Sequence, residues 1–165
     1  MAPLQFTLDI TPQTRVSLTD VRSHAAATVG DSLDRYTHCC YSSLHTTAGY
    51  LPQSLQRRLV GQKQGVTSYL DLYRALFPER GGYRHDDLGE RNELTVEQRR
   101  REPLNGDSHL RFIFGGLRAC VSYRLRSDPV YFVDLDGIFD NTPRQRTTVL
   151  VGYDEEVTVA HIDLE

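Results

Sequence analysis

The sequence lacks a long hydrophobic run, has few cysteines and carries no excess of basic residues. No stretch of its 165 residues approaches the roughly 18 consecutive apolar residues of a membrane-spanning helix. A net charge of -3 is unlike the strongly basic balance of a general nucleic-acid-binding protein. We therefore expect no membrane and no nucleic-acid partner, and a small-molecule ligand instead.

Only three cysteines are present, and Cys39 and Cys40 are adjacent. Neighbours in a strand point to opposite faces, so Cys120 can reach only one of them, and a disulfide framework is not expected. Residues 1–4 lead directly into alternating side chains, without the basic and apolar regions of a signal peptide. We expect a cytoplasmic protein with reduced thiols, in which Cys39 and Cys40 are buried small residues, and a catalytic role for either stays open.

Hydrophobic periodicity predicts the secondary structure of the first two thirds of the chain. Alternation predicts strands over residues 4–10 and 14–18, and Thr19 or Asp20 can cap a helix that ends at Gly30. β-forming residues predict a central strand over residues 36–44. Helical spacing predicts a short helix within 50–65, helices over 66–77 and 93–102, and a short element from Asp107 or Ser108 to Phe114.

Four further strands are expected without helices between them, over residues 119–125, 130–135, 147–152 and 156–162. Successive strands with short connections predict an antiparallel meander. We find no internal repeat and no linker that would divide the chain. Residues 1–165 are therefore expected to form a single α+β domain, an antiparallel β-sheet or sandwich core with two to three helices packed on one side.

Three histidines stand in short polar clusters. His45 follows the central strand, and the hydroxyls of Thr46 and Thr47 can donate to an oxygen-rich ligand or bond back onto the turn. His85 lies in a charged loop, and His109 lies near a helix N-terminus, which keeps an imidazole neutral. Three neutral histidines at one point would bind a divalent ion, zinc above all, and leave a position open for water. Alternatively, each is an ordinary strand, loop or helix residue, because the spacing lacks the tight local pattern of a metal motif.

Acidic and basic residues add two further open questions. Asp134 and Asp136 are two apart on an expected strand, so they share a face and can form a carboxylate pair for acid-base chemistry. In the alternative, one orients a neighbouring group and the other is solvated. The run from Arg99 to Arg101 is either a solvated helix face or an anion site.

Five segments resemble, in chain order, the motifs of the YjbQ family, also called the secondary thiamine-phosphate synthase family. They are His-Thr-Thr-Ala at 45–48, Tyr-Arg-His-Asp at 83–86, Asn-Gly-Asp-Ser-His-Leu at 105–110, Asp-Leu-Asp-Gly at 134–137 and Pro-Arg-Gln-Arg at 143–146. The resemblance implies a compact α+β fold with a β-sandwich-like core and a homotrimer. It also implies a histidine-lined pocket for a metal or an oxyanion, and a weak thiamine-phosphate synthase side activity.

The residues and the resemblance together give eight candidates for the pocket. Catalytic roles go to His45, His85, His109 and Asp134, metal ligation goes to the same three histidines, and ligand binding goes to Thr46, Thr47, Asn105 and Arg144. The sequence departs from the family at three places. Residues 51–54 replace an asparagine-rich segment, the Gly-Thr-Trp-Gln turn is missing in a chain without tryptophan, and residues 138–142 are inserted between Asp-Gly and Pro-Arg.

Two functions stay open at this point. In the enzyme hypothesis, a metal or cationic cluster on the histidines binds a phosphate or activates a water, Asp134 or Asp86 orients a histidine, and Arg144 neutralises the anion. In the binding hypothesis, the same pocket holds a metal, an anion or a metabolite without turning it over.

Overall fold

The computed structural model describes residues 2–60, 65–124 and 128–154, whose strands form two antiparallel sheets and a hairpin. The first sheet has the order β1 (Leu4–Ile10), β9 (Arg146–Tyr153), β3 (His38–Ser42) and β5 (Cys120–Arg124). The second has the order β2 (Ser17–Asp20), β6 (Tyr131–Asp134) and β4 (Ala48–Tyr50). The hairpin joins β7 (Ile138–Phe139) to β8 (Thr142–Pro143).

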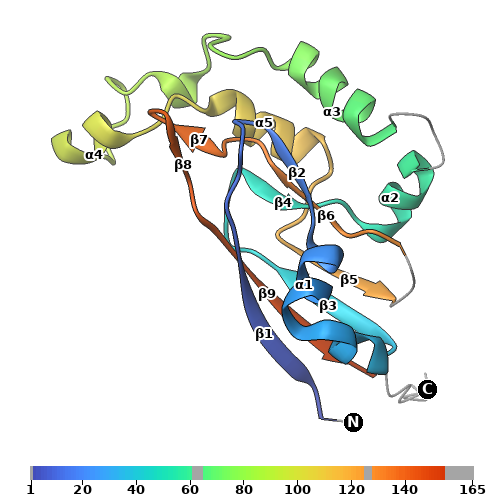
Figure 1. Ribbon diagram of the computed structural model, residues 1–165. Helices are drawn as coiled ribbons and strands as arrows, with labels where there is room; N and C mark the ends of the chain where they lie inside the picture. The colour runs from blue at the N-terminus through green and yellow to red at the C-terminus, as the bar shows by residue number, and fades with distance from the viewer. Residues whose placement is uncertain (1, 61–64, 125–127, 155–165) are drawn as a thin grey trace, which may run out of the picture.

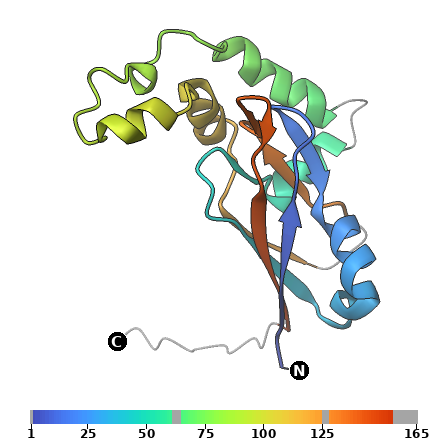
Figure 2. The same cartoon turned by 60° about the vertical axis from the view of Figure 1, so that its left-hand side comes forward.

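The described part of the chain contains five α-helices: α1 (Val21–Val29), α2 (Gln53–Val60), α3 (Gly65–Leu76), α4 (Val96–Arg101) and α5 (Gly106–Phe114). Two 3-10 turns, η1 (Gly30–Arg35) and η2 (Arg84–Asp86), connect them to their neighbours. Figures 1 and 2 show α3, α4 and α5 gathered at one end of the molecule, while β1 and β9 run side by side toward the other end. None of the described helices is long and apolar enough to cross a membrane.

The β6 strand separates two hydrophobic cores. Phe132 belongs to the core between the two sheets, which also contains Leu8 of β1 and Tyr41 of β3. Its neighbour Val133 belongs to a second core, against which side chains of α2, α3 and α5 pack. Alternate residues of a strand point to opposite faces, so β6 faces the first sheet on one side and a layer of helices on the other. The hydroxyl pair of Tyr50 and Thr148 also joins β4 to β9 across the first core.

Local signals explain the first helix. The side chain of Asp20 accepts hydrogen bonds from the backbone N–H groups of Arg22 and Ser23, which have no partner within the helix. The same carboxylate accepts the N–H of Val130 and so ties the helix start to the β6 region. At the other end, Gly30 has a φ of 61°, a conformation that glycine adopts without a steric penalty.

The structure confirms the α+β class and most of the expected elements. The strand over 4–10, the helix capped by Asp20 and the helices near 50–65, 66–77, 93–102 and 107–114 are present with small shifts of their ends. Helices α2, α3 and α5 pack on one side as expected, whereas α1 contributes to the core between the sheets and α4 has no buried side chain. The expected strand over 156–162 lies outside the described residues.

The meander prediction was wrong. Strands β5, β6 and β9 do not pair with one another: β5 pairs with β3, β6 pairs with β2 and β4, and β9 pairs with β1 and β3. The reason is that the chain crosses from the first sheet to the second at β6 and returns at β9, so its strands alternate between the sheets.

The five-residue insertion at 138–142, together with Pro143, forms the β7–β8 hairpin. Its two central residues, Asp140 and Asn141, have φ values of 48° and 59°. Two successive residues with positive φ define a type I′ turn, whose twist matches that of antiparallel strands, and Asp and Asn tolerate this conformation. The insertion therefore extends the loop between β6 and β9 as a self-contained hairpin.

Candidate functional site

A cluster of buried charges lies where β6 ends and β9 begins. Asp134, the last residue of β6, accepts hydrogen bonds of 2.7 and 2.9 Å from the guanidinium of Arg146. Two residues later, Asp136 accepts a hydrogen bond of 2.6 Å from the Asn105 amide and an ion-paired hydrogen bond from Arg144. We call these five residues the Asp136 cluster. Each carboxylate has its own arginine, which argues against a proton shared between them.

The backbone holds the Asp136 cluster together. The N–H of Asp136 donates to the carboxylate of Asp134 at 3.0 Å, and Arg146 donates to the Asp136 carbonyl at 2.8 Å. Asn105 immediately precedes α5 and is 4% exposed. Its carbonyl oxygen Oδ1 has no hydrogen-bond partner among the described residues. A buried amide oxygen without a partner calls for a water or a ligand at that position.

His85 and His109 lie against each other, with ring centroids 4.6 Å apart. His85 is held on both ring nitrogens: Nδ1 lies 3.1 Å from the Asp86 carboxylate and Nε2 lies 3.4 Å from the Arg91 guanidinium. A carboxylate only accepts and a guanidinium only donates, so this network assigns the hydrogen of His85 to Nδ1 and the lone pair to Nε2. Asp86 also accepts the N–H of Gly106 at 2.8 Å, which ties η2 to the start of α5.

His109, like His85, is partly buried. Burial lowers its pKa below the ordinary histidine value, and the neighbouring His85 lowers it further, whereas Asp136 acts in the opposite direction. His109 is therefore neutral at pH 7. None of the described residues forms a hydrogen bond with its ring nitrogens, so an imidazole lone pair is available beside the Asp136 cluster.

His45 lies near the arginines of the Asp136 cluster. Its Nε2 accepts the backbone N–H of Thr147 at 3.1 Å, so this contact assigns the hydrogen to Nδ1. Burial lowers the pKa of His45, and Arg146 and Arg144 lower it further against the opposing effect of Asp134. Two arginines and one carboxylate therefore act on His45, and both arginines are themselves paired with carboxylates of the Asp136 cluster.

The other predicted residues fall into two groups. Thr46 is exposed, and it follows His45 at the rim of the cluster. Thr47 is buried, and its backbone carbonyl accepts the N–H of Leu135 at 3.0 Å, so its position supports the pairing of β4 with β6. The structure thus groups His85 with His109. Asp136 acts on His109 and Arg144 acts on His45, so the Asp136–Arg144 ion pair lies between this group and His45. Among the described residues, no group of three or more histidine, cysteine or acidic side chains is arranged to hold a metal ion.

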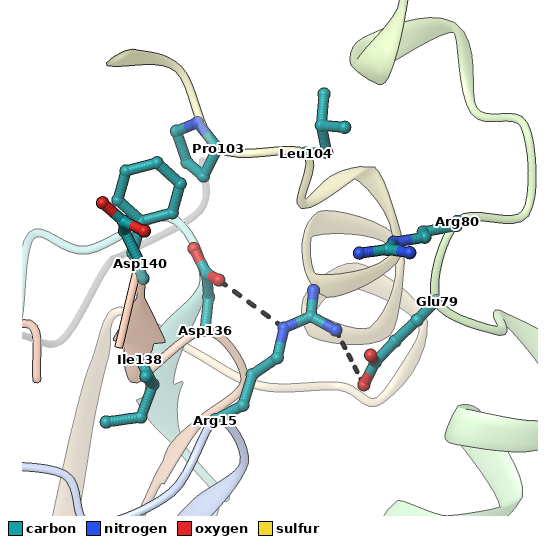
Figure 3. Close-up of a pocket in the computed structure, with 9 residues that line it drawn as sticks. Arg15, Glu79, Arg80, Pro103, Leu104, Asp136, Ile138 and Asp140 are labelled. Atoms are coloured by element: carbon teal, nitrogen blue, oxygen red, sulfur yellow. Dashed lines mark ion pairs between the residues drawn. The ribbon is translucent and has the colours of Figure 1, made fainter. Parts of the chain in front are cut away.

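A cavity of about 320 Å³ also borders Asp136 (Figure 3). Arg15 reaches across its floor, 2.7 Å from Glu79 and 3.9 Å from Asp136. The Arg80 guanidinium points into the same space from the segment after α3, and Asp140 approaches it from the β7–β8 hairpin. Sequence reasoning missed Arg15 and the cavity, because the partners of Arg15 come from segments far along the chain and no local pattern marks them.

Arg15 also joins the cavity to the first turn of α5. Its guanidinium lies 3.0 Å from Asp107, a fully buried carboxylate that is also 3.0 Å from Arg111. Asp107 thereby forms ion pairs with two arginines at once. The only signal for it in the sequence was an acidic residue in the first turn of a helix, which is favourable there in any protein.

Comparison with known proteins identifies the fold. No family model matches this sequence, and a search of curated proteins finds no match. A hypothetical protein from Aeropyrum pernix K1 has a similar structure, with a TM-score of 0.58 and 18% identity over 92% of this chain and 99% of that one. A YbjQ-like protein of unknown function from Sulfolobus solfataricus P2 gives a TM-score of 0.59 and 15% identity over 93% of this chain and 98% of its own. An uncharacterised YjbQ/UPF0047 family protein from Clostridium acetobutylicum gives a TM-score of 0.56 and 17% identity over 88% of this chain and 97% of its own.

Proposed function

We propose that this chain, which has the fold of the YjbQ-like proteins, binds a small phosphate-type anion. The anion would lie between His45 and Arg144, which belongs to the Asp136 cluster. The observation that carries the proposal is the hydrogen bond from the Thr147 N–H to Nε2 of His45. It leaves His45 with an N–H at Nδ1, which is a donor for an anion and not a ligand for a metal.

The charge and the exposure of the neighbouring side chains support the same assignment. Arg144 is 34% exposed, so its guanidinium can bind an oxyanion while it keeps its contact with Asp136. The hydroxyl of Thr46 lies at the exposed rim and can add a further donor. The cavity of about 320 Å³ at Asp136 is the size of a small-molecule site, but neither His45 nor Arg144 lines it, so we do not assign it to the anion.

Zinc on His45, His85 and His109 is the alternative, and it requires two rearrangements. His85 would have to release Arg91 from Nε2, and His45 would have to release Thr147 or bind through a deprotonated Nδ1. We therefore propose anion binding as the first candidate function of this site and zinc binding as the second.

A catalytic role is a secondary proposal, favoured by one observation. His109 is neutral and its ring nitrogens have no partner among the described residues, which suits a general base that takes a proton from a ligand bound at the cluster. A thiamine-phosphate-synthase-like side activity would use this base. We also propose a homotrimer, as the family resemblance implies, and a location in the cytoplasm, as the N-terminal sequence pattern suggests.

Calorimetric titration at two pH values separates the two ligands. The probes are sulfate, which keeps its charge, and zinc, at about pH 7.5 and about pH 5.5, on either side of the ordinary histidine pKa of about 6.5. Sulfate should bind more tightly at the lower pH, because protonation of His45 at Nε2, with release of the Thr147 N–H, adds charge beside Arg144. Zinc should bind more weakly there, because protons compete for the same lone pairs.

Matched variants locate the site. Arg144→Gln should weaken sulfate binding at least tenfold, whereas Arg74→Gln, which changes an exposed arginine on α3, should leave it unchanged. Absence of sulfate binding in the wild type, or equal binding in Arg144→Gln, would reject the anion proposal. Tight zinc binding that is lost in His85→Ala would establish the alternative.

A further inference from the structure

Two of the three cysteines lie side by side on the outer face of the first sheet. Strands β3 and β5 pair so that Cys40 is opposite Ser122 and Ser42 is opposite Cys120. Cys40 and Cys120 are therefore diagonal neighbours on one face. Their sulfur atoms are 3.4 Å apart, close enough for a weak S–H···S contact. Both thiols are free.

The pair differs from the remaining cysteine in its access to solvent. Cys120 is exposed and Cys40 is partly exposed, whereas Cys39 points to the opposite face and is fully buried in the core. A soft metal ion would need further ligands, and no described group of three histidine, cysteine or acidic side chains supplies them. Two accessible thiols in contact, without a third ligand, are suited to forming a bond with each other.

A disulfide requires the two sulfurs of this pair to move together, with an adjustment of the two strands as diagonal neighbours. The S–S bond length is about 2.05 Å, so the two sulfurs must approach by about 1.4 Å from their present 3.4 Å. The hydrogen bonds between β3 and β5 already hold the two backbones in register, and both residues lie within the paired segment. The sheet therefore places the two thiols before any oxidation takes place.

We propose that Cys40 and Cys120 form a site of reversible oxidation, in which a hydroperoxide converts the two thiols into an intrachain disulfide. In the first step, the Cys120 thiolate attacks a peroxide oxygen, the O–O bond breaks, and Cys120 becomes a sulfenic acid while water or an alcohol leaves after protonation. In the second step, the Cys40 sulfur attacks the Cys120 sulfur, the S–O bond breaks, and water leaves. The hydroperoxide is reduced by two electrons and the thiol pair is oxidised by two.

The environment assigns the order of these steps. Burial, together with the contact with Cys120, raises the pKa of the Cys40 thiol to about 11. The thiolate is the reactive form, so Cys40 is the poorer first nucleophile and the more exposed Cys120 reacts first. Once Cys120 is a sulfenic acid, its sulfur is an electrophile in contact with Cys40. Excess dithiothreitol returns both residues to thiols by exchange.

The crosslink would lie close to the point where β3 leaves the sheet. The N–H of Ser43 donates to the carbonyl of Ala119 at 2.8 Å, which continues the pairing one step beyond Cys120. His45 follows two residues later. Oxidation would therefore fix the base of the segment that carries His45, although disulfide formation itself requires no ligand at the Asp136 cluster.

The test uses the full, reduced chain and hydrogen peroxide as the probe. After brief oxidation and alkylation, mass spectrometry of the intact protein should show the loss of two hydrogens, and peptide mapping should link Cys40 to Cys120. Dithiothreitol should reverse both signals. The buried Cys39 should stay reduced and become alkylated only after denaturation.

Single variants provide matched controls. Cys120→Ser should abolish the loss of two hydrogens, Cys40→Ser should accumulate a sulfenic acid at Cys120 that dimedone captures, and Cys39→Ala should oxidise like the wild type. An arsenical that bridges two neighbouring thiols, phenylarsine oxide, should bind the wild type and neither serine variant. A folded wild type that gives no Cys40–Cys120 link, or gives only links between chains, would overturn the proposal.

Discussion

The carboxylate of Asp134 and the guanidinium of Arg146 share two hydrogen bonds of 2.7 and 2.9 Å, and each side chain is at most 4% exposed. The pair connects the end of β6 in the second sheet to the start of β9 in the first. Both charges are removed from water, so each is stabilised mainly by the other.

Removal of one partner of this pair should be strongly destabilising. Arg146→Met leaves a buried carboxylate without its cation, and we expect a loss of about 3–5 kcal/mol in the free energy of unfolding, measured by urea titration. The double variant Asp134→Leu/Arg146→Met should recover most of this loss, because neither charge remains. Arg74→Met, an exposed arginine on α3, should have little effect. A single variant as stable as the wild type would show that water reaches Asp134.

Acidification should destabilise the protein through His45 and His109. The pKa of each is lowered, first by burial and then by a cationic or imidazole neighbour, so the unfolded chain binds protons at a higher pH than the native protein does. The free energy of unfolding should therefore fall as the pH drops below about 6.5 and continue to fall through the native pKa. His109→Gln should flatten this dependence, whereas His24→Gln, on the exposed face of α1, should not. Identical slopes in wild type and His109→Gln would contradict the neutral state of His109.

Arg91 should control access to His85. Its guanidinium lies 3.4 Å from Nε2 of His85 and 3.0 Å from Glu102. Arg91→Gln should free the imidazole lone pair and raise the affinity for zinc by at least tenfold in a calorimetric titration, while Arg84→Gln, an exposed change in η2, should leave it unaltered. Unchanged zinc affinity in Arg91→Gln would mean that His85 does not ligate zinc.

Association should give a homotrimer. The first sheet ends in β1 on one side and β5 on the other, and edge strands offer unpaired backbone groups to a partner. Light scattering at micromolar concentration should give three times the 18.8 kDa mass of the chain. A species of one chain mass under these conditions would reject the trimer.

Local signals in the sequence predicted the elements well. Asp20 and Gly30 mark the two ends of α1, and the alternation over residues 4–10 reproduces β1. These local patterns are sufficient because a helix cap or an alternation of hydrophobic residues depends only on residues within a few positions of one another. The α+β class followed from the same patterns.

Pairings over long distances could not be predicted in this way. Arg15 and Asp107 are 92 residues apart and nothing local marks either as the partner of the other. The meander was wrong for the same reason, because short connections between β5, β6 and β9 do not reveal a change of sheet. The candidate histidines were named from polar clusters and a family resemblance, but the hydrogen bonds of His45 and His85, which distinguish an anion site from a zinc site, required coordinates.

The position of β6 between two cores also fixes its alignment. Phe132 and Asp134 share one face of the strand, and Val133 and Leu135 share the other. A slip of one residue against β2 and β4 would carry the Asp134 carboxylate under the helices and bring Val133 toward Arg146. Both charges would then be buried without a partner, so misaligned forms of the second sheet are penalised as soon as the first sheet has closed. The ion pair therefore favours the native register of the second sheet over a register shifted by one residue.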